Sequence, residues 1–150
     1  MQADETTTDG LLVTRFVVGT AAFGLDARLV LEVVKVGDLT RVHNAPAEVL
    51  GIRNLRGRIV TVVDMAMHLQ LGQVTADAES RLLIMEHQGE TYGFLVDTVT
   101  DATAMDAEAL ETPPASLSPA LRRRLVGVWR QGGQLTAILN PATLFQWNEE

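Results

Sequence analysis

Three histidines, His43, His68 and His87, are the side chains of this chain best suited to move a proton or to hold a metal near neutral pH. Their separations of 25 and 19 residues match neither a metal motif nor a catalytic triad. The sequence around them predicts that His68 lies on a helix and that His87 ends a strand. We therefore interpret each as a surface histidine or one whose hydrogen bonds are satisfied.

Other catalytic patterns are equally weak. The chain has no cysteine, which excludes disulfides and thiolate metal sites. Ser80, Ser116 and Ser118 lack the glycine-flanked elbow of a serine hydrolase. The segment "GTAAFG" at 19–24 has no Lys-Ser or Lys-Thr pair, and it reads as a hairpin rather than a phosphate loop. The sequence therefore predicts no catalytic residue, cofactor or metal, and an enzyme is the less favoured hypothesis.

Composition narrows the possible partners. The 150 residues are 47% hydrophobic and 21% charged, as in an ordinary globular domain. The net charge of −7 argues against nucleic acid as a ligand. The only basic run, Arg122 to Arg124, is interpreted as a solvated lead into a strand, with contact to an acidic partner surface as the alternative.

The first ten residues predict a disordered tail at 1–10 rather than a signal peptide, because they are polar and contain no apolar stretch. No apolar run reaches the roughly 18 residues of a membrane span. Association with a membrane is therefore expected only indirectly, through a partner. A start at Met1 without a further domain favours a free-standing protein over a fragment of a larger one.

A cluster of three arginines is the remaining group of side chains that could bind a ligand or partner. Arg53, Arg56 and Arg58 lie in the apolar stretch "VLGIRNLRGRIVTVVDM" at 49–65. "NLRG" reads as a hairpin loop in which Gly57 supplies an unusual backbone angle. Arg56 on that loop presents a planar fork of donors suited to carboxylates. Arg53 and Arg58 are interpreted as outward-facing strand residues.

The elements that must position these arginines form an internal repeat. Two β-hairpins are predicted, beginning at 11–18 and 80–87, and an offset of 69 residues aligns Phe23 with Tyr92. An offset of 76 residues aligns Gly57 with Gly133 and places Gly132 at the position of Arg56. The comparison therefore argues against a structural role for Arg56, since a requirement of the fold should recur in both repeats.

We expect an all-β fold with short helices. Each repeat supplies strands for a five-stranded barrel, the first at about 11–77 and the second at about 78–147, packed together as one domain at 11–147. Asp64 and Asn140 are predicted to cap short helices. About seven extra residues of the second repeat fall in the proline-rich stretch 106–120, which is predicted to be a long loop.

Several segments of the chain resemble the CheW family of chemotaxis coupling proteins. "NLRGRIVTVVDM" is similar to the family's signature, roughly N-L-R-G, apolar residues, then V-D-L. Three further blocks resemble family blocks in the same order, and together they cover about Leu11 to Gln146: "FGLDARLVLEVVKV", "TRVHNAPAEVLGIRN" and "YGFLVDTVTDA".

The resemblance implies two intimately packed SH3-like barrels. It also implies a cytoplasmic, non-catalytic adaptor that bridges the tip of chemoreceptors in membrane arrays to the regulatory domain of a CheA-type histidine kinase. Its receptor-contact positions fall on Val30, Glu32 and Arg56, with Val99 in the groove between the barrels. Asn54, Leu55 and Gly57 complete the turn.

Some positions depart from the family pattern, among them Leu31, Thr61 and Met65. We expect these departures to leave the fold untouched, but they leave open which receptor the chain would bind. A regulatory module of a related pathway, in pilus movement, gliding or surface sensing, is the alternative function.

Overall fold

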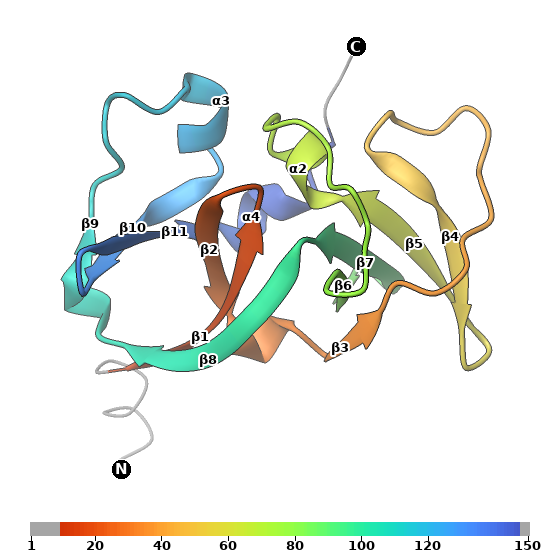
Figure 1. Ribbon diagram of the computed structural model, residues 1–150, viewed down its shortest axis with the longest axis horizontal. Helices are drawn as coiled ribbons and strands as arrows, with labels where there is room; N and C mark the ends of the chain where they lie inside the picture. The colour runs from red at the N-terminus through yellow and green to blue at the C-terminus, as the bar shows by residue number, and fades with distance from the viewer. Residues whose placement is uncertain (1–9, 148–150) are drawn as a thin grey trace.

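The computed structural model describes residues 10–147, and strands joined by tight turns and short helices dominate it (Figure 1). The strands are β1 Leu11–Val18, β2 Ala21–Asp26, β3 Glu32–Lys35, β4 Val49–Leu55, β5 Arg58–Asp64, β6 Arg81–His87, β7 Glu90–Val96, β8 Thr98–Met105, β9 Leu110–Glu111, β10 Leu125–Gln131 and β11 Gln134–Leu139. The helices are η1 Ala27–Leu29, α2 Met65–His68, η2 Ala107–Ala109, α3 Pro119–Arg122 and α4 Pro141–Leu144.

None of the helices in this part of the chain is long and apolar enough to cross a membrane. The predicted tail at 1–10 falls outside the described residues apart from Gly10.

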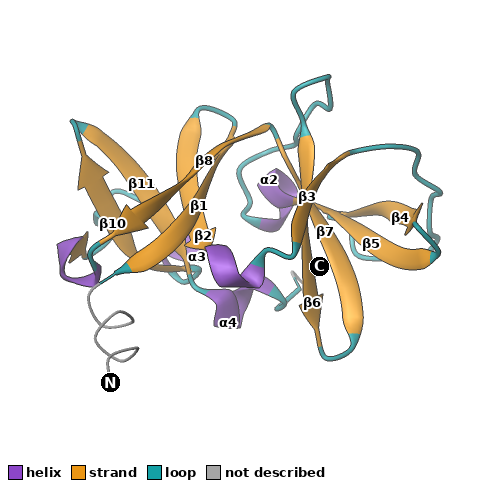
Figure 2. Ribbon diagram, turned by 90° about the horizontal axis from the view of Figure 1, so that it is seen from below, coloured by secondary structure: helices purple, strands orange, loops and turns teal. Residues whose placement is uncertain are grey.

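The strands form two curved sheets that lie side by side (Figure 2). Sheet A has the order β8-β1-β2-β11-β10-β9, and sheet B has the order β3-β6-β7-β5-β4. Neighbouring strands are antiparallel except for two parallel pairs, β2 with β11 and β5 with β7. This architecture confirms the predicted all-β class with two packed barrels. Sheet A has a sixth strand, the two-residue β9, which pairs with β10. β9 lies inside the stretch 106–120 that was predicted to be a long loop.

Each sheet takes strands from both halves of the chain. β1 and β2 join β8 to β11 in sheet A, whereas β6 and β7 join β3 to β5 in sheet B. The predicted assignment of residues 11–77 to one barrel and 78–147 to the other is therefore wrong. The physical reason is the parallel pairing, which places the first hairpin of each repeat beside the last strand of the other repeat and so exchanges hairpins between the barrels.

The repeat itself is reproduced in the strand register. Phe23 pairs with Ala137 across one parallel contact, and Tyr92 pairs with Thr61 across the other. These are equivalent pairs under the same offsets of 69 and 76 residues that align the sequence. The irregular pairings in β4 and β10 also fall at equivalent places. The two repeats are thus structural copies related by an exchange of hairpins.

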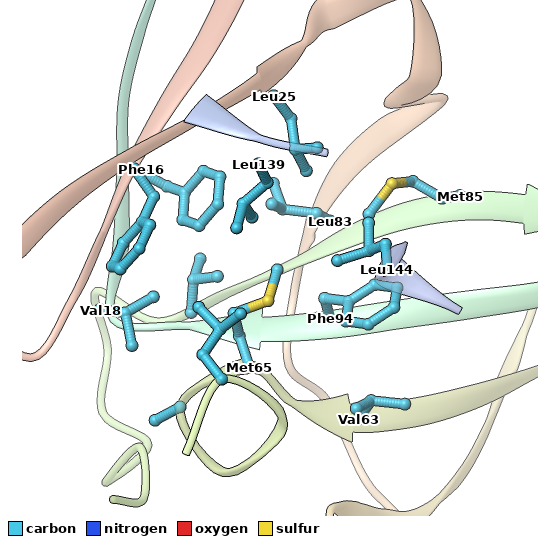
Figure 3. Close-up of a cluster of buried hydrophobic side chains, with 14 of the residues drawn as sticks. Phe16, Val18, Leu25, Val63, Met65, Leu83, Met85, Phe94, Leu139 and Leu144 are labelled. Carbon is cyan, nitrogen blue, oxygen red and sulfur yellow. The ribbon is translucent and has the colours of Figure 1, made fainter. Parts of the chain in front are cut away.

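The largest apolar core lies between the sheets and not inside either one. Inside sheet B the buried core has six members, and inside sheet A it has four. The junction cluster has sixteen buried members from both sheets and the helices, and Figure 3 shows part of it, including Phe16, Leu83 and Leu139. Because burying one large apolar side chain contributes about 1.5–3 kcal/mol, this shared core makes the two barrels interdependent.

The helix caps were predicted correctly. The Asp64 side chain accepts a hydrogen bond from the Met67 N–H at 3.2 Å at the start of α2, and Asn140 accepts one from the Ala142 N–H at 3.0 Å at the start of α4. Asp64 also accepts from the Val74 N–H at 3.0 Å, which holds the segment after α2. Both helices therefore begin where the last strand of a repeat ends.

Candidate functional site

The β4–β5 hairpin builds the site around Arg56. Leu55 pairs with Arg58, which leaves Arg56 and Gly57 as a two-residue loop. Both loop residues are left-handed, with φ of 53° and 87°, as a type I′ turn requires. Asn54 Oδ1 accepts a hydrogen bond from the Gly57 N–H at 2.8 Å. The turn predicted from "NLRG" is therefore confirmed.

Arginine is an unfavourable choice at its place in this turn. The left-handed conformation costs a residue with a Cβ atom about 1–2 kcal/mol. Gly132 occupies the equivalent position of the second repeat, with φ of 58°, and meets the same backbone requirement without strain. The conformation of the turn does not explain why residue 56 is an arginine. We therefore look for a role of the Arg56 side chain outside the turn.

The Arg56 guanidinium donates from Nη2 to Glu32 Oε2. Glu32 begins β3, the strand at the edge of sheet B. The two side chains are 66% and 38% exposed. An ion pair with this exposure contributes only about 0–1 kcal/mol to stability. Its value to the fold is small, and both charges are available at the surface.

A small hollow of about 160 Å³ lies beneath the pair, and its lining residues are Glu32, Leu55, Arg56, Arg58 and Ile84. Leu55 and Ile84 belong to the core of sheet B and provide an apolar floor. Arg58 adds a second cation and lies 3.4 Å from Glu86. The hollow therefore combines both signs of charge with an apolar base.

Two members of this hollow escaped the sequence analysis. Arg58 was interpreted as an ordinary strand residue. Ile84 was not considered, because it reaches the site only through its pairing with Glu32 across β3 and β6. No local signal in the sequence marks that pairing. Arg53, also interpreted as outward-facing, instead donates to the backbone carbonyls of Lys35 and Val36 and ties β4 to the end of β3.

The two predicted valines lie elsewhere. Val30 follows η1 two residues before Glu32, and Val99 pairs with Phe16 across β1 and β8. Both are half-buried and pack against the junction cluster. The structure thus brings Glu32, Leu55 and Arg56 together in one hollow, while Asn54 and Gly57 shape the turn and the valines border the junction of the barrels.

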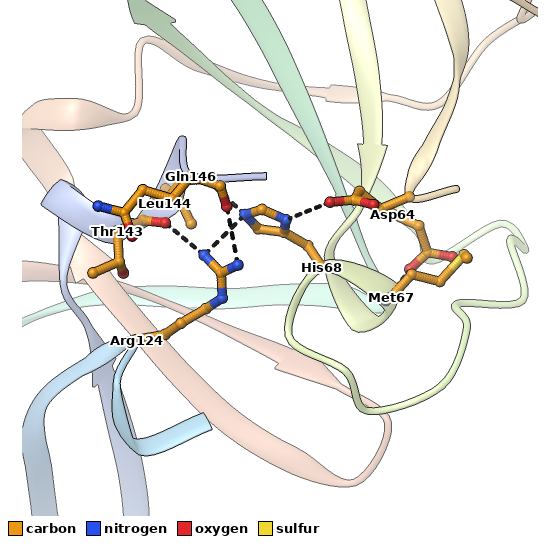
Figure 4. Close-up of polar contacts among 8 residues, drawn as sticks. Asp64, Met67, His68, Arg124, Thr143, Leu144 and Gln146 are labelled. Atoms are coloured by element: carbon orange, nitrogen blue, oxygen red, sulfur yellow. Dashed lines mark hydrogen bonds and ion pairs between the residues drawn. The ribbon is translucent and has the colours of Figure 1, made fainter. Parts of the chain in front are cut away.

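The three histidines lie on different parts of the fold: His43 is exposed in a turn between β3 and β4, His68 ends α2 and His87 ends β6. His68 is buried on α2, with Nε2 2.6 Å from the Leu144 carbonyl oxygen (Figure 4). Its Nδ1 lies 3.3 Å from the Glu48 carboxylate. Burial lowers the pKa of His68, and the charge of Arg124 lowers it further. His87 stacks on Phe145 with ring centroids 4.2 Å apart. His68 therefore links the two repeats, in agreement with the interpretation of a satisfied histidine.

Two packed barrels that carry an exposed, strained arginine beside a charged hollow with an apolar floor are consistent with a protein-binding module. Comparisons with known proteins identify the family. Residues 13–149 match the model of the CheW-like domain.

Individual proteins agree with this match. The chain is 30% identical over 142 residues to the chemotaxis protein CheW of Treponema pallidum, which covers 92% of this chain and 83% of that protein. It is 29% identical over 133 residues to protein FrzA of Myxococcus xanthus, with coverages of 87% and 82%. The crystal structure of the scaffolding protein TtCheW from Thermoanaerobacter tengcongensis is similar, with a TM-score of 0.81 at 28% identity over 93% of this chain and 90% of that one. The chain belongs to the CheW-like family, as its sequence motifs predicted.

Proposed function

We propose that this protein is a non-catalytic adaptor that couples the cytoplasmic tip of chemoreceptors to the regulatory domain of a CheA-type histidine kinase. It acts in the cytoplasm in chemotaxis or a chemotaxis-like pathway, and its partners recruit it to receptor arrays at the membrane. Membership of the CheW-like family and the similarity to a scaffolding protein support this proposal.

The observation that carries the proposal is the exposed Arg56–Glu32 pair on a turn whose equivalent in the second repeat carries glycine. An amphipathic helical hairpin, the partner we propose, offers apolar residues flanked by charges. Val30 and Val99 supply apolar contacts at the barrel junction, while Arg56 and Glu32 set the register of the bound helices.

Binding to a purified receptor cytoplasmic fragment tests this assignment. The Arg56→Gly variant introduces the residue that the second repeat has at the equivalent position, Gly132. It therefore removes the charge and keeps the turn. Glu32→Gln removes the opposite charge. Each should weaken receptor binding by about 2–5 kcal/mol, the cost of truncating one desolvated charge of an interface. Isothermal titration calorimetry measures the affinity. A urea titration should show that Glu32→Gln changes stability by no more than about 0.5 kcal/mol, and that Arg56→Gly does not lower it, because glycine adopts the left-handed backbone without strain.

Arg130→Ala is the matched control, because Arg130 forms an exposed pair with Glu111 at 3.4 Å beside the equivalent hairpin of the other barrel. It should leave receptor affinity unchanged. The assignment is wrong if Arg56→Gly and Glu32→Gln bind as tightly as the parent chain, or if they unfold instead of losing binding.

A further inference from the structure

A second and larger hollow lies where the ends of α2, α3 and α4 meet. Its volume is about 440 Å³, and it shares no lining residue with the Arg56 hollow. The polar and aromatic residues that line it are Gln70, Arg123, Arg124, Thr143, Gln146 and Trp147. None of the described residues that line it is acidic. We call this hollow the junction pocket.

The junction pocket is built on the internal repeat. Gln70 and Gln146 are equivalent residues under the offset of 76, and both line it. Glu48 and Arg124 are equivalent as well. The Glu48 carbonyl accepts from the Asp64 N–H at 2.8 Å, and the Arg124 carbonyl accepts from the Asn140 N–H at 2.7 Å. The backbone is the same in both repeats, but only the second repeat places a cation at this position.

Arg123 differs even more from its equivalent in the first repeat, which is Ala47. The fold accepts alanine at that place, so the backbone does not require the Arg123 side chain. Arg123 is exposed, and it lines the junction pocket. By the same comparison that singles out Arg56, its charge serves something other than the fold.

Arg124 is held in place at the pocket wall. Its Nη2 donates to the Gln146 carbonyl at 3.0 Å and its Nη1 donates to the Thr143 carbonyl (Figure 4). Burial lowers the pKa of Arg124, Glu48 acts in the opposite direction, and the neighbouring charge of Arg123 adds to the lowering. The buried Glu48 carboxylate partly offsets the Arg124 charge, whereas none of the described residues that line the pocket offers a carboxylate to the exposed Arg123. Arg123 therefore presents its charge to an anion in the pocket.

We infer that the junction pocket binds an acidic peptide segment of a partner protein, whose carboxylate lies against Arg123 and Arg124. The Arg123 guanidinium fork matches a carboxylate with two parallel hydrogen bonds, while Arg124, whose Nη1 and Nη2 already donate to backbone carbonyls, adds its charge. The side-chain amides of Gln70 and Gln146 can donate to and accept from a peptide backbone. Trp147 offers an apolar wall to the aliphatic part of an acidic side chain. The volume exceeds what a bare phosphate group fills, which favours a peptide.

The full chain is titrated with an acetylated, amidated peptide of four glutamates at low ionic strength by isothermal titration calorimetry. The matching peptide of four glutamines and inorganic phosphate are titrated in parallel. The glutamate peptide should bind, the glutamine peptide should not, and phosphate should bind more weakly. Arg123→Ala should weaken binding of the glutamate peptide by about tenfold or more, as expected for loss of a charge-assisted donor, without a change in melting temperature.

Arg122→Ala is the matched control, since Arg122 is the adjacent exposed arginine and donates to the Leu117 carbonyl at 3.1 Å outside the pocket lining. It should change the affinity less than about twofold, as expected for a charge without direct contact. Equal losses in Arg122→Ala and Arg123→Ala would overturn the inference, as would equal binding of the two peptides, or phosphate binding as tight as that of the glutamate peptide. Arg56→Gly should bind the peptide normally, so this test and the receptor test fail independently.

Discussion

At the scale of single residues, pseudo-equivalent positions separate what the fold needs from what a partner needs. Arg56 and Gly132 share a left-handed backbone, and Arg123 and Ala47 share an equivalent place in the two repeats. In each pair one member is small and uncharged, which shows that the backbone tolerates the absence of a charged side chain. This comparison is why we propose that both arginines serve binding rather than folding.

Asp64 allows a prediction of pH dependence. Its side chain is buried, and burial raises the pKa of Asp64 despite the N–H donors of Val74 and Met67. A raised folded-state pKa means that the contribution of Asp64 to stability is full below the unfolded-state value of about 3.9 and is lost as the pH rises through the folded-state value. The stability of the parent chain relative to Asp64→Asn should therefore decrease from pH 4 toward pH 7.

Urea midpoints of both proteins across that range measure the difference. The Asp106→Asn variant, which removes one carboxylate from the exposed cap of η2, controls for the loss of one acidic charge. A difference between parent and Asp64→Asn that is constant with pH, or that grows as the pH rises, would contradict the raised pKa.

At the scale of elements, the parallel strand pairs are where the repeats interlock, and a glycine lies in each. Gly24 pairs with Ile138, and Gly93 pairs with Val62. A Cβ atom at Gly24 would lie 2.5 Å from Val13 Cγ1 and 2.9 Å from Ile138 Cδ1, whereas the nearest atom at Gly93 would be 3.1 Å away. Equivalent glycines therefore differ in how closely the neighbouring side chains approach.

Gly24→Ala should destabilise the protein by about 1–3 kcal/mol, because β-branched Val13 cannot easily move aside in a packed core. Gly93→Ala should cost less. Chemical denaturation followed by circular dichroism gives both free energies of unfolding. If Gly93→Ala lowered the free energy of unfolding more than Gly24→Ala, close packing at the parallel strand pairs would not be the reason for these glycines.

At the scale of the whole molecule, the exchanged hairpins and the shared junction core make one cooperative unit. A fragment of residues 1–77 would carry β3, β4 and β5 without β6 and β7, which separate β3 from β5 in sheet B. It would also lose eight of the sixteen buried members of the junction cluster, among them Leu83, Phe94 and Leu139.

We therefore expect fragments 1–77 and 78–150 to be unfolded when separate and to regain strand structure when mixed. The intact chain should unfold in a single transition. Circular dichroism and the dispersion of amide NMR signals report both results. A separate 1–77 fragment with cooperative unfolding would show that the barrels are independent after all.

The sequence by itself determined the hairpin strands, the glycine turns, the two helix caps, the repeat and the family motif, but it placed β9 in a loop. These features depend on residues close together in the chain, such as Asn54 and Gly57 or Asp64 and Met67, whose preferences are local. The special status of Arg56 was also accessible, since it needed only a comparison of the two repeats.

Only the tertiary structure decided which hairpin completes which barrel, because a parallel pair of strands has no turn between them to mark it. The same non-local pairing brings Ile84 beneath the Arg56–Glu32 pair and gathers Arg123, Gln70 and Gln146 around one pocket. These contacts join residues far apart in the chain, and they form only when both repeats bury their apolar faces in the common core.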